Sequence, residues 1–200
     1  ILEHLHKVDT IVLDKTGTIT TGKISVGEVR GAVTRGTGQE GRNMLLQYAA
    51  SAEQASEHLM GSAIVRYAGE QHVQLFPCAA FRAFPGQGVE ASVQGSRVLV
   101  GTRALLEANG IAIDPVVVQE AEQIGQTGKT VVWVARGGEL LGLLALMDVP
   151  KEDAHEAVGL LKRMNIDVTM VTGDNFGSAQ AVAVRTGISS IIAGVSPAGK

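Results

Sequence analysis

The chain has 200 residues, of which 45% are hydrophobic and 18% are charged, and its formal net charge at pH 7 is −3. This length suits one large or two small domains, and the weak acidic balance argues against a surface that binds nucleic acid or anionic membranes. The single cysteine excludes an intrachain disulfide and fits a reducing compartment. The longest apolar run, Leu140–Met147, is far shorter than the ~20 residues of a membrane-spanning helix.

The first expected element is a buried strand over residues 8–13, a short, β-branched and apolar run typical of parallel sheets. It places Asp14 at its carboxyl end, where ligands bind in open α/β sheets. Thr16, Gly17 and Thr18 follow as a polar turn whose N–H groups and hydroxyls suit phosphate oxygens. A carboxylate in this position can attack phosphorus and become an aspartyl phosphate.

After Thr20 the pattern predicts helices packed on a mostly antiparallel sheet. Ser56 is expected to cap the second of these helices, with Glu57 in its first turn, and Asp114 with Pro115 to begin the fourth. The expected elements are an extended segment over 22–33, helices around 44–52 and 56–69, a hairpin over 81–100 that turns at Gln94-Gly95, helices over 102–109 and 115–128, and strands over 130–135 and 140–147.

From residue 148 the chain returns to an α/β pattern. A helix is expected over 151–164, a strand over 167–171, a helix over 178–186 that ends at Gly187, and a last strand over 188–193. In the helix over 151–164, Ala154, Ala157, Val158 and Leu161 are expected to face inward. If the strand over 167–171 is a neighbour of the first strand, Thr172 and Gly173 face a phosphate on Asp14 and stabilise developing charge.

The heptapeptide from Asp14 to Thr20, DKTGTIT, resembles the D-K-T-G-T-[IL]-T signature of the P-type ATPases. Thr172-Gly173-Asp174-Asn175 matches their T-G-D-N element. Pro197 and Lys200 match their P-x-x-K element, although Ala198 and Gly199 replace its usual acidic pair; alternatively Lys200 is a surface lysine. Asp148 and Lys151 match a D-x-x-K element, which we assign to structure and hinge.

This resemblance implies the chemistry and the class of fold. It assigns catalysis to Asp14, Lys15, Thr16, Thr172, Gly173 and Lys200, and places Mg²⁺ on Asp14 and Thr16. Thr16 stands where phosphohydrolase relatives carry a general acid, which predicts slow hydrolysis of the phosphoenzyme. The expected fold is α/β: a haloacid-dehalogenase-like doubly wound parallel sheet, incomplete at the C-terminus, with an inserted α+β antiparallel-sheet domain. The family's Gly-Asp-Gly-x-Asn-Asp loop does not occur before Lys200, so we expect a piece of a longer protein that lacks part of its metal site.

Inside the insertion, Glu53, Ser56-Glu57-His58, Gly86-Gln87-Gly88 and Gly101 resemble the nucleotide-binding domain of the heavy-metal (P1B) branch. The alternatives are an ordinary histidine at a helix start and a glycine loop before a hairpin. The resemblance implies that Glu53 and His58 recognise adenine. It also implies that Gly86, Gly88, Gly101 and Asp174 lie close to the nucleotide. Leu59 replaces the branch's proline and Thr102 its asparagine, and both departures weaken the expected affinity.

The expected organisation is therefore a phosphorylation domain over 1–23 and 145–200 and a nucleotide-binding domain over 24–144, with a hinge near 21–24 and 144–148. ATP and Mg²⁺ are the expected cofactors, at the cytoplasmic face of a membrane. The expected partners are the actuator and transmembrane domains of the parent protein and a metallochaperone, with no nucleic acid. Cu(I) is the first expected ion, and zinc, cadmium or cobalt is the alternative. A soluble phosphohydrolase and a nucleotide-binding module without turnover are the rival functions.

Overall fold

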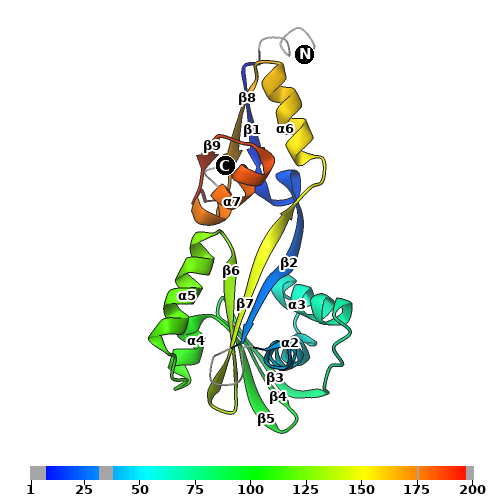
Figure 1. Ribbon diagram of the computed structural model, residues 1–200, viewed down its shortest axis with the longest axis vertical. Coiled ribbons are helices and arrows are strands. Elements are labelled where there is room, and N and C mark those ends of the chain that lie inside the picture. Colours follow the sequence, from blue (N-terminus) through cyan, green and yellow to red (C-terminus); the bar gives the residue numbers. More distant parts are fainter. Residues whose placement is uncertain (1–7, 32–37, 175, 197–200) are drawn as a thin grey trace. The chain divides into compact units, whose positions relative to one another are not determined.

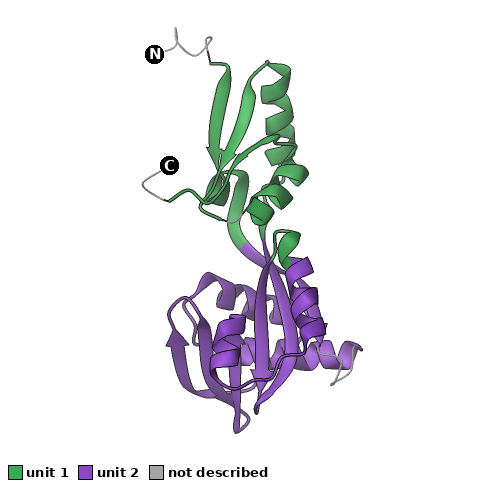
Figure 2. Cartoon of the chain, turned by 90° about the vertical axis from the view of Figure 1, so that its left-hand side faces the viewer, with its two compact units in different colours: residues 1–23, 125–129, 148–200 green, residues 24–124, 130–147 purple. Residues whose placement is uncertain are grey.

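The computed structural model describes residues 8–31, 38–174 and 176–196. Contacts within the chain divide these residues into two compact units, coloured separately in Figure 2. Unit 1 holds the described residues of 1–23, 125–129 and 148–200, and unit 2 holds those of 24–124 and 130–147. Two long strands, β2 (Thr20–Gly31) and β7 (Glu139–Pro150), contribute residues to both units.

Unit 1 is built on a parallel sheet whose strands, in the described part of the chain, follow the order β1-β8-β9. β1 pairs with β8 along its whole length, so that Asp14 lies opposite Val171. The predicted neighbourhood of these two strands is confirmed. The elements are β1 (Thr10–Asp14), a short turn η1 (Lys15–Ile19), α6 (Ala154–Arg163), β8 (Asp167–Val171), α7 (Phe176–Thr186) and β9 (Ser190–Ile192).

One apolar core joins the helices and strands of unit 1. Val158 of α6, Met170 of β8 and Val182 of α7 are buried in the same cluster. The helix α7 ends before Gly187, whose φ of +79° is one that glycine adopts readily, as predicted for its C-cap.

The predicted start of α6 at residue 151 is wrong, because the helix begins at Ala154. The N–H of Lys151 donates to the carbonyl of Ile19 instead of entering a helix, which ties this segment to the turn after β1. Ala157 is exposed, contrary to expectation. The inward stripe of α6 is formed by the buried Ala154 and Val158 and the partly buried Leu161, at spacings of four and three residues.

Unit 2 contains the predicted insertion of helices on a sheet. Within the described residues its strands follow the order β2-β7-β6-β5-β4-β3, and the pairs from β3 through β7 are antiparallel. Its remaining elements are α2 (Gln39–Glu53), α3 (Leu59–Glu70), β3 (Cys78–Phe84), β4 (Gly88–Val93), β5 (Ser96–Gly101), α4 (Arg103–Ala108), α5 (Pro115–Gln126) and β6 (Thr130–Arg136). The hairpin of β4 and β5 turns at Gln94 and Gly95 with φ of 51° and 68°, the backbone of a type I′ turn.

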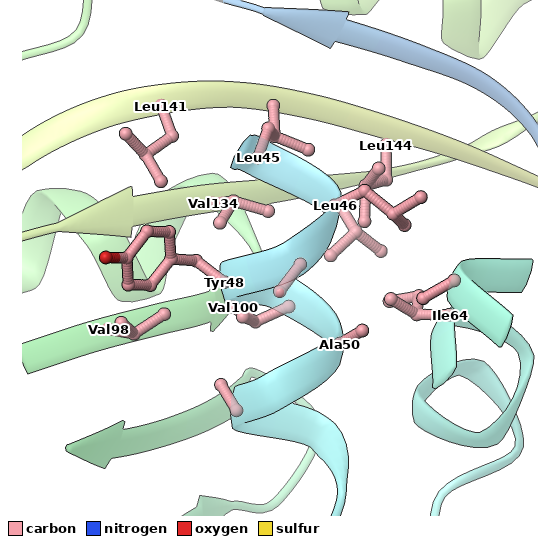
Figure 3. Packing of buried hydrophobic residues seen from close by; sticks show 14 of the residues in the cluster. Leu45, Leu46, Tyr48, Ala50, Ile64, Val98, Val100, Val134, Leu141 and Leu144 are labelled. Carbon is pink, nitrogen blue, oxygen red and sulfur yellow. The ribbon is translucent and has the colours of Figure 1, made fainter. Parts of the chain in front are cut away.

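Helices cover both faces of this sheet, α2 and α3 on one and α4 and α5 on the other (Figure 1). Successive residues of a strand point to opposite faces, so Val98 and Val100 of β5 pack under α2 while Leu99 packs under α4 and α5. Figure 3 shows Leu45 and Leu46 of α2 lying over the sheet. The apolar runs of β5 to β7 are therefore buried on both sides.

The predicted cap of α3 is wrong by two residues. The helix begins at Leu59, and His58 is its N-cap, with Nδ1 accepting a hydrogen bond from the N–H of Met60 at 3.2 Å. Ser56 lies in the corner that follows α2, where its N–H donates to the carbonyl of Glu53. Glu57 consequently lies outside the first turn.

Candidate functional site

Asp14 and Thr172 lie at the ends of two adjacent strands in unit 1. Because β1 and β8 run parallel and in register, their carboxyl ends meet at one edge of the sheet. Asp14 is half-buried there, Thr172 is buried and Gly173 is exposed. The Thr172 hydroxyl oxygen accepts the N–H of Asp174 at 3.1 Å, and a hydroxyl that accepts a hydrogen bond can still donate one, here to an anion.

The turn after Asp14 is fixed by hydrogen bonds of the buried Thr20 side chain. The Thr20 side chain is fully buried, and its hydroxyl contacts Oδ2 of Asp148 at 2.6 Å and the carbonyl of Lys15 at 3.1 Å. Gly17 has a φ of +78° and, with Thr16, breaks the helical backbone of the turn. Thr16, Gly17 and Thr18 are exposed, as a turn that receives phosphate oxygens requires.

Lys15 is only 2% exposed, which is unusual for a lysine. Its ammonium forms an ion pair with Asp174, lies 3.8 Å from Oδ2 of Asp148, and donates to Oγ of Ser178 at 3.4 Å. The positive charge of Lys15 therefore offsets part of the charge of two carboxylates and links the turn after β1 to the loop after β8. The Asp148 and Ser178 contacts with Lys15 were not expected from the sequence, in which Ser178 is 163 residues away.

Not every predicted residue of this site is described. Lys200 and Asn175 lie outside the described residues, so the catalytic assignment of Lys200 stays a prediction. In the described ranges no cluster of three or more His, Cys, Asp or Glu side chains could hold a metal ion. Asp14 still offers a carboxylate of the kind Mg²⁺ prefers, and this ion commonly uses one or two carboxylates together with phosphate oxygens and water. Asp14 and Thr16 could thus supply some of the oxygen ligands of Mg²⁺, with phosphate and water supplying the others.

Unit 2 contains a cleft of about 730 Å³, within the range of small-molecule sites. It lies between the α2–α3 corner, the turn from β3 to β4, the end of β5 and the start of β6. Its walls include all the residues of this unit that were predicted to bind nucleotide: Glu53, His58, Gly86, Gly88 and Gly101. Asp174, predicted to join them, belongs to unit 1.

Glu53 ends α2 inside this cleft and is only 6% exposed. Its Oε2 is buried and has no hydrogen-bond partner among the described residues. Burial raises the pKa of the Glu53 carboxyl above its ordinary value, and a hydrogen bond with the Ser56 side chain lowers it by less. This shift favours the protonated carboxyl more than in a solvent-exposed glutamate.

His58 combines a place in the cleft wall with the capping of α3. Because Nδ1 accepts the N–H of Met60, the neutral ring carries its hydrogen on Nε2. The cap fixes the orientation of an otherwise exposed imidazole and leaves an N–H donor for a ligand. Leu59, which stands where the branch has proline, is 67% exposed beside it.

Gly88 and Gly101 are needed by the sheet itself. They face each other across β4 and β5. A Cβ atom at Gly101 would overlap with the carbonyl of Gln87 and lie 2.8 Å from Cα of Gly88. Gly86, by contrast, has open space around it and a φ of +72°. The two paired glycines shape the floor of the cleft, while their predicted contact with nucleotide stays a prediction.

Thr102, the second departure from the branch, has a structural task. Its hydroxyl caps α4 by accepting the N–H of Leu105 at 3.3 Å, and its own N–H donates to the carbonyl of Gln87 at 2.7 Å. The Thr102 side chain thus stabilises the start of α4, next to the wall of the cleft.

The family model of haloacid dehalogenase-like hydrolases matches residues 8–200. The chain belongs to the haloacid dehalogenase-like hydrolase family. The parallel sheet of unit 1 with its insertion agrees with the fold class predicted from the sequence.

Relatives of this haloacid dehalogenase-like chain confirm the predicted kinship with heavy-metal P-type ATPases. A copper-exporting P-type ATPase of Staphylococcus aureus (strain JH9) is 39% identical over 196 residues, which are 98% of this chain and 23% of the relative. A crystal structure of a zinc-transporting PIB-type ATPase in the E2.Pi state superposes with a TM-score of 0.84 at 32% identity, over 99% of this chain and 31% of that one. The N-domain of HMA6, a copper-transporting P-type ATPase, matches 62% of this chain and 98% of its own, with a TM-score of 0.51 and 25% identity.

The chain therefore spans about a quarter of the length of the curated relatives that it matches. Within the described ranges, no helix combines the length and apolar composition needed to cross a membrane.

Proposed function

We propose that this chain is the ATP-binding and phosphorylation region of a heavy-metal-transporting P-type ATPase, and that Asp14 accepts the phosphate. The observation that carries the proposal is the position of Asp14 at the end of β1, next to Thr172 at the end of the paired strand β8. We assign unit 1 to the phosphorylation domain, which the sequence predicts at 1–23 and 145–200, and unit 2 to the nucleotide-binding domain, which it predicts at 24–144. The two units differ from these segments in that unit 1 also holds 125–129 and unit 2 extends to residue 147.

In the proposed reaction a carboxylate oxygen of Asp14 forms a bond to the γ-phosphorus of ATP. The bond from that phosphorus to the bridging oxygen breaks, and ADP leaves with the electron pair. The exposed turn at Thr16 to Thr18 and the hydroxyl of Thr172 donate hydrogen bonds to the phosphoryl oxygens. Since Lys15 offsets one of the two negative charges of Asp148 and Asp174, the incoming phosphate meets less repulsion than two unpaired carboxylates would exert.

Mg²⁺, when bound, would neutralise and orient the phosphoryl oxygens. In this chain Asp14 and Thr16 are the residues assigned to hold it. The exposed Thr16 offers no acid or base that could activate water, which favours a phosphoenzyme that decays slowly.

We assign adenine to the cleft of unit 2, beside Glu53 and His58. Adenine presents an amino group that donates hydrogen bonds, and Oε2 of Glu53, which has no hydrogen-bond partner among the described residues, can accept one. The cleft has enough volume for a nucleoside, and its walls are largely carbon, as is common for such sites.

The identity of the transported ion depends on the whole parent protein. Copper-exporting relatives at 39% identity support Cu(I), and the zinc-transporting structure at 32% identity supports zinc as the second candidate. The same proposal places the chain at the cytoplasmic face of a membrane. Its partners would be the actuator and transmembrane domains of the same protein and a metallochaperone.

The test is incubation of the chain with Mg²⁺ and ATP labelled in its γ-phosphate, with calorimetry of ATP binding alongside. We expect a protein-bound label that survives acid and is released by hydroxylamine, as an acyl phosphate is. Asp14→Asn should abolish the label and leave ATP binding unchanged, whereas Asp9→Asn, at an exposed position, should retain both. ATP binding without any label on the wild type would instead identify a nucleotide-binding module. Rapid turnover of small phosphate esters would indicate a phosphohydrolase.

A further inference from the structure

Gly61 is a buried residue in the first turn of α3, where a glycine has no evident conformational purpose. Its φ is not in the positive range, so any residue can adopt its backbone conformation. A glycine inside a helix lowers stability by roughly 1 kcal/mol relative to alanine. The reason for a glycine at this position must therefore be space.

The space above Gly61 is occupied by two residues from the α2–α3 corner. A Cβ atom at Gly61 would overlap with Oε2 of Glu53 and would lie 2.8 Å from Oγ and 2.9 Å from Cβ of Ser56. Atoms in proteins do not remain at such separations unless they are bonded or hydrogen-bonded. Any side chain at this position must displace the Glu53 carboxyl, Ser56 or both.

Glu53, Ser56 and His58 are connected to one another. The Ser56 side chain lies next to the Glu53 carboxyl on the same side of Gly61 and lowers its pKa, and its Oγ accepts the N–H of His58 at 3.3 Å. All three residues line the cleft, whereas Gly61 does not. A change at Gly61 thus reaches a bound ligand only through these neighbours.

We propose that Gly61 is a positioning residue for nucleotide recognition: the missing side chain lets the Glu53 carboxyl and Ser56 lie against α3, which holds the Glu53–Ser56–His58 group at the wall of the cleft. The inference rests on the proposed function of that cleft and adds to it a residue that touches no ligand. The carboxyl is held by the shape of the helix surface beneath it, because its Oε2 has no hydrogen-bond partner among the described residues.

The experiment compares Gly61→Ala with Gly69→Ala in the 200-residue chain. Gly69 lies in the same helix and has no atom within 4 Å of its added Cβ, so it controls for the general effect of alanine. ATP affinity is measured by calorimetry for both variants, for Glu53→Ala, and for the double variant Glu53→Ala/Gly61→Ala. We expect Gly61→Ala to weaken ATP binding about tenfold, the equivalent of one misplaced hydrogen bond, and Gly69→Ala to leave it unchanged.

The double variant separates positioning from a general disturbance of α3. If Gly61 acts through Glu53, the Gly61→Ala substitution should weaken ATP binding less than twofold in the Glu53→Ala background. An equal loss in both backgrounds, or wild-type affinity of a folded Gly61→Ala, would overturn the proposal.

A second readout does not depend on ATP. The Glu53 carboxyl is titrated by carbon-detected NMR in the wild type and in Gly61→Ala. Displacement toward solvent should move the pKa of Glu53 back toward its ordinary value, and an unchanged titration would contradict the role of Gly61. If the wild type binds no ATP, the proposed function fails, while this titration still decides whether Gly61 positions the carboxyl.

Discussion

In unit 1 the proposed phosphate site is dense in charge: Lys15 is buried against Asp174 and Asp148, and Thr20 donates to Asp148 from beneath the turn. In unit 2 the proposed nucleotide cleft has apolar walls, one buried carboxyl without a full set of partners, and a floor shaped by glycines. The first site is stabilised mainly by ion pairs. The shape of the second depends mainly on glycines, because a side chain at these positions would overlap with neighbouring atoms. Substitutions should therefore damage the two sites through different physical causes.

The largest effect is expected from filling the floor of the cleft. Gly101→Ala would place a Cβ atom against the backbone of Gln87 and Gly88, which cannot move without breaking the β4–β5 pairing. We expect the free energy of unfolding to fall by about 3 kcal/mol, measured by urea denaturation. Gly69→Ala, which adds a methyl group into open space, is the control. It should be at least as stable as the wild type. Equal stabilities of the two variants would show that the paired glycines are not sterically required.

The next effect tests charge compensation in unit 1. Lys15→Met keeps the aliphatic stem and removes the ammonium, which leaves Asp148 and Asp174 without their partner. Asp174 is 44% exposed and regains water, so we expect a loss of about 2 kcal/mol, below the range for a fully buried pair.

Adding Asp148→Asn to Lys15→Met should restore part of that loss, because one uncompensated carboxylate is then neutral. Urea denaturation of both variants provides the measurement. A double variant less stable than Lys15→Met would contradict the charge-compensation account and assign Asp148 mainly to its hydrogen bond with Thr20.

A third prediction concerns Glu53, a titratable group that is buried in the cleft. Since burial raises the pKa of Glu53, the native state binds more protons than the unfolded state at pH values between the ordinary and the raised pKa. The contribution of this group to stability is therefore greatest at low pH and declines as pH rises through that interval. Glu53→Gln, neutral throughout, should remove this decline.

The measurement is the free energy of unfolding as a function of pH for the wild type, Glu53→Gln and Glu57→Gln. The exposed neighbour Glu57 controls for the loss of a negative charge and should leave the profile unchanged. A wild-type profile that Glu53→Gln does not flatten would mean that the carboxyl is ionised in the native cleft.

The smallest effect is expected at Leu59, the first residue of α3. The φ of −78° and ψ of 138° at His58 suit a residue before proline, and proline is favoured at the first helical position. We expect Leu59→Pro to raise the free energy of unfolding by about 0.5 kcal/mol, detected as a higher melting temperature. Leu59→Ala should not reproduce the gain. A destabilised Leu59→Pro would show that the N–H of Leu59 has a partner in the corner.

Part of this protein could be read from its sequence because the signals are local. An apolar run before Asp14 and a polar turn after it indicate the end of a strand, and the Thr172-Gly173-Asp174 segment follows a second such run. Because the carboxyl ends of parallel strands lie at one edge of a sheet, the two segments could be predicted to meet there. The alternation in β4 and β5, with Gln94-Gly95 between them, fixed the hairpin in the same way, because side-chain period and turn geometry act over a few residues.

Only the tertiary structure decided the contacts that connect distant segments. Nothing in the sequence near Lys15 indicates Asp148 or Ser178 as its neighbours, and the space beneath Glu53 depends on how α3 packs against the end of α2. The sequence predicts Ser56 as a helix cap, yet the corner after α2 places its Oγ beside the Glu53 carboxyl, where it accepts the N–H of His58. Packing selects among locally acceptable conformations by the contacts each allows, and those contacts come from residues that the local pattern does not contain.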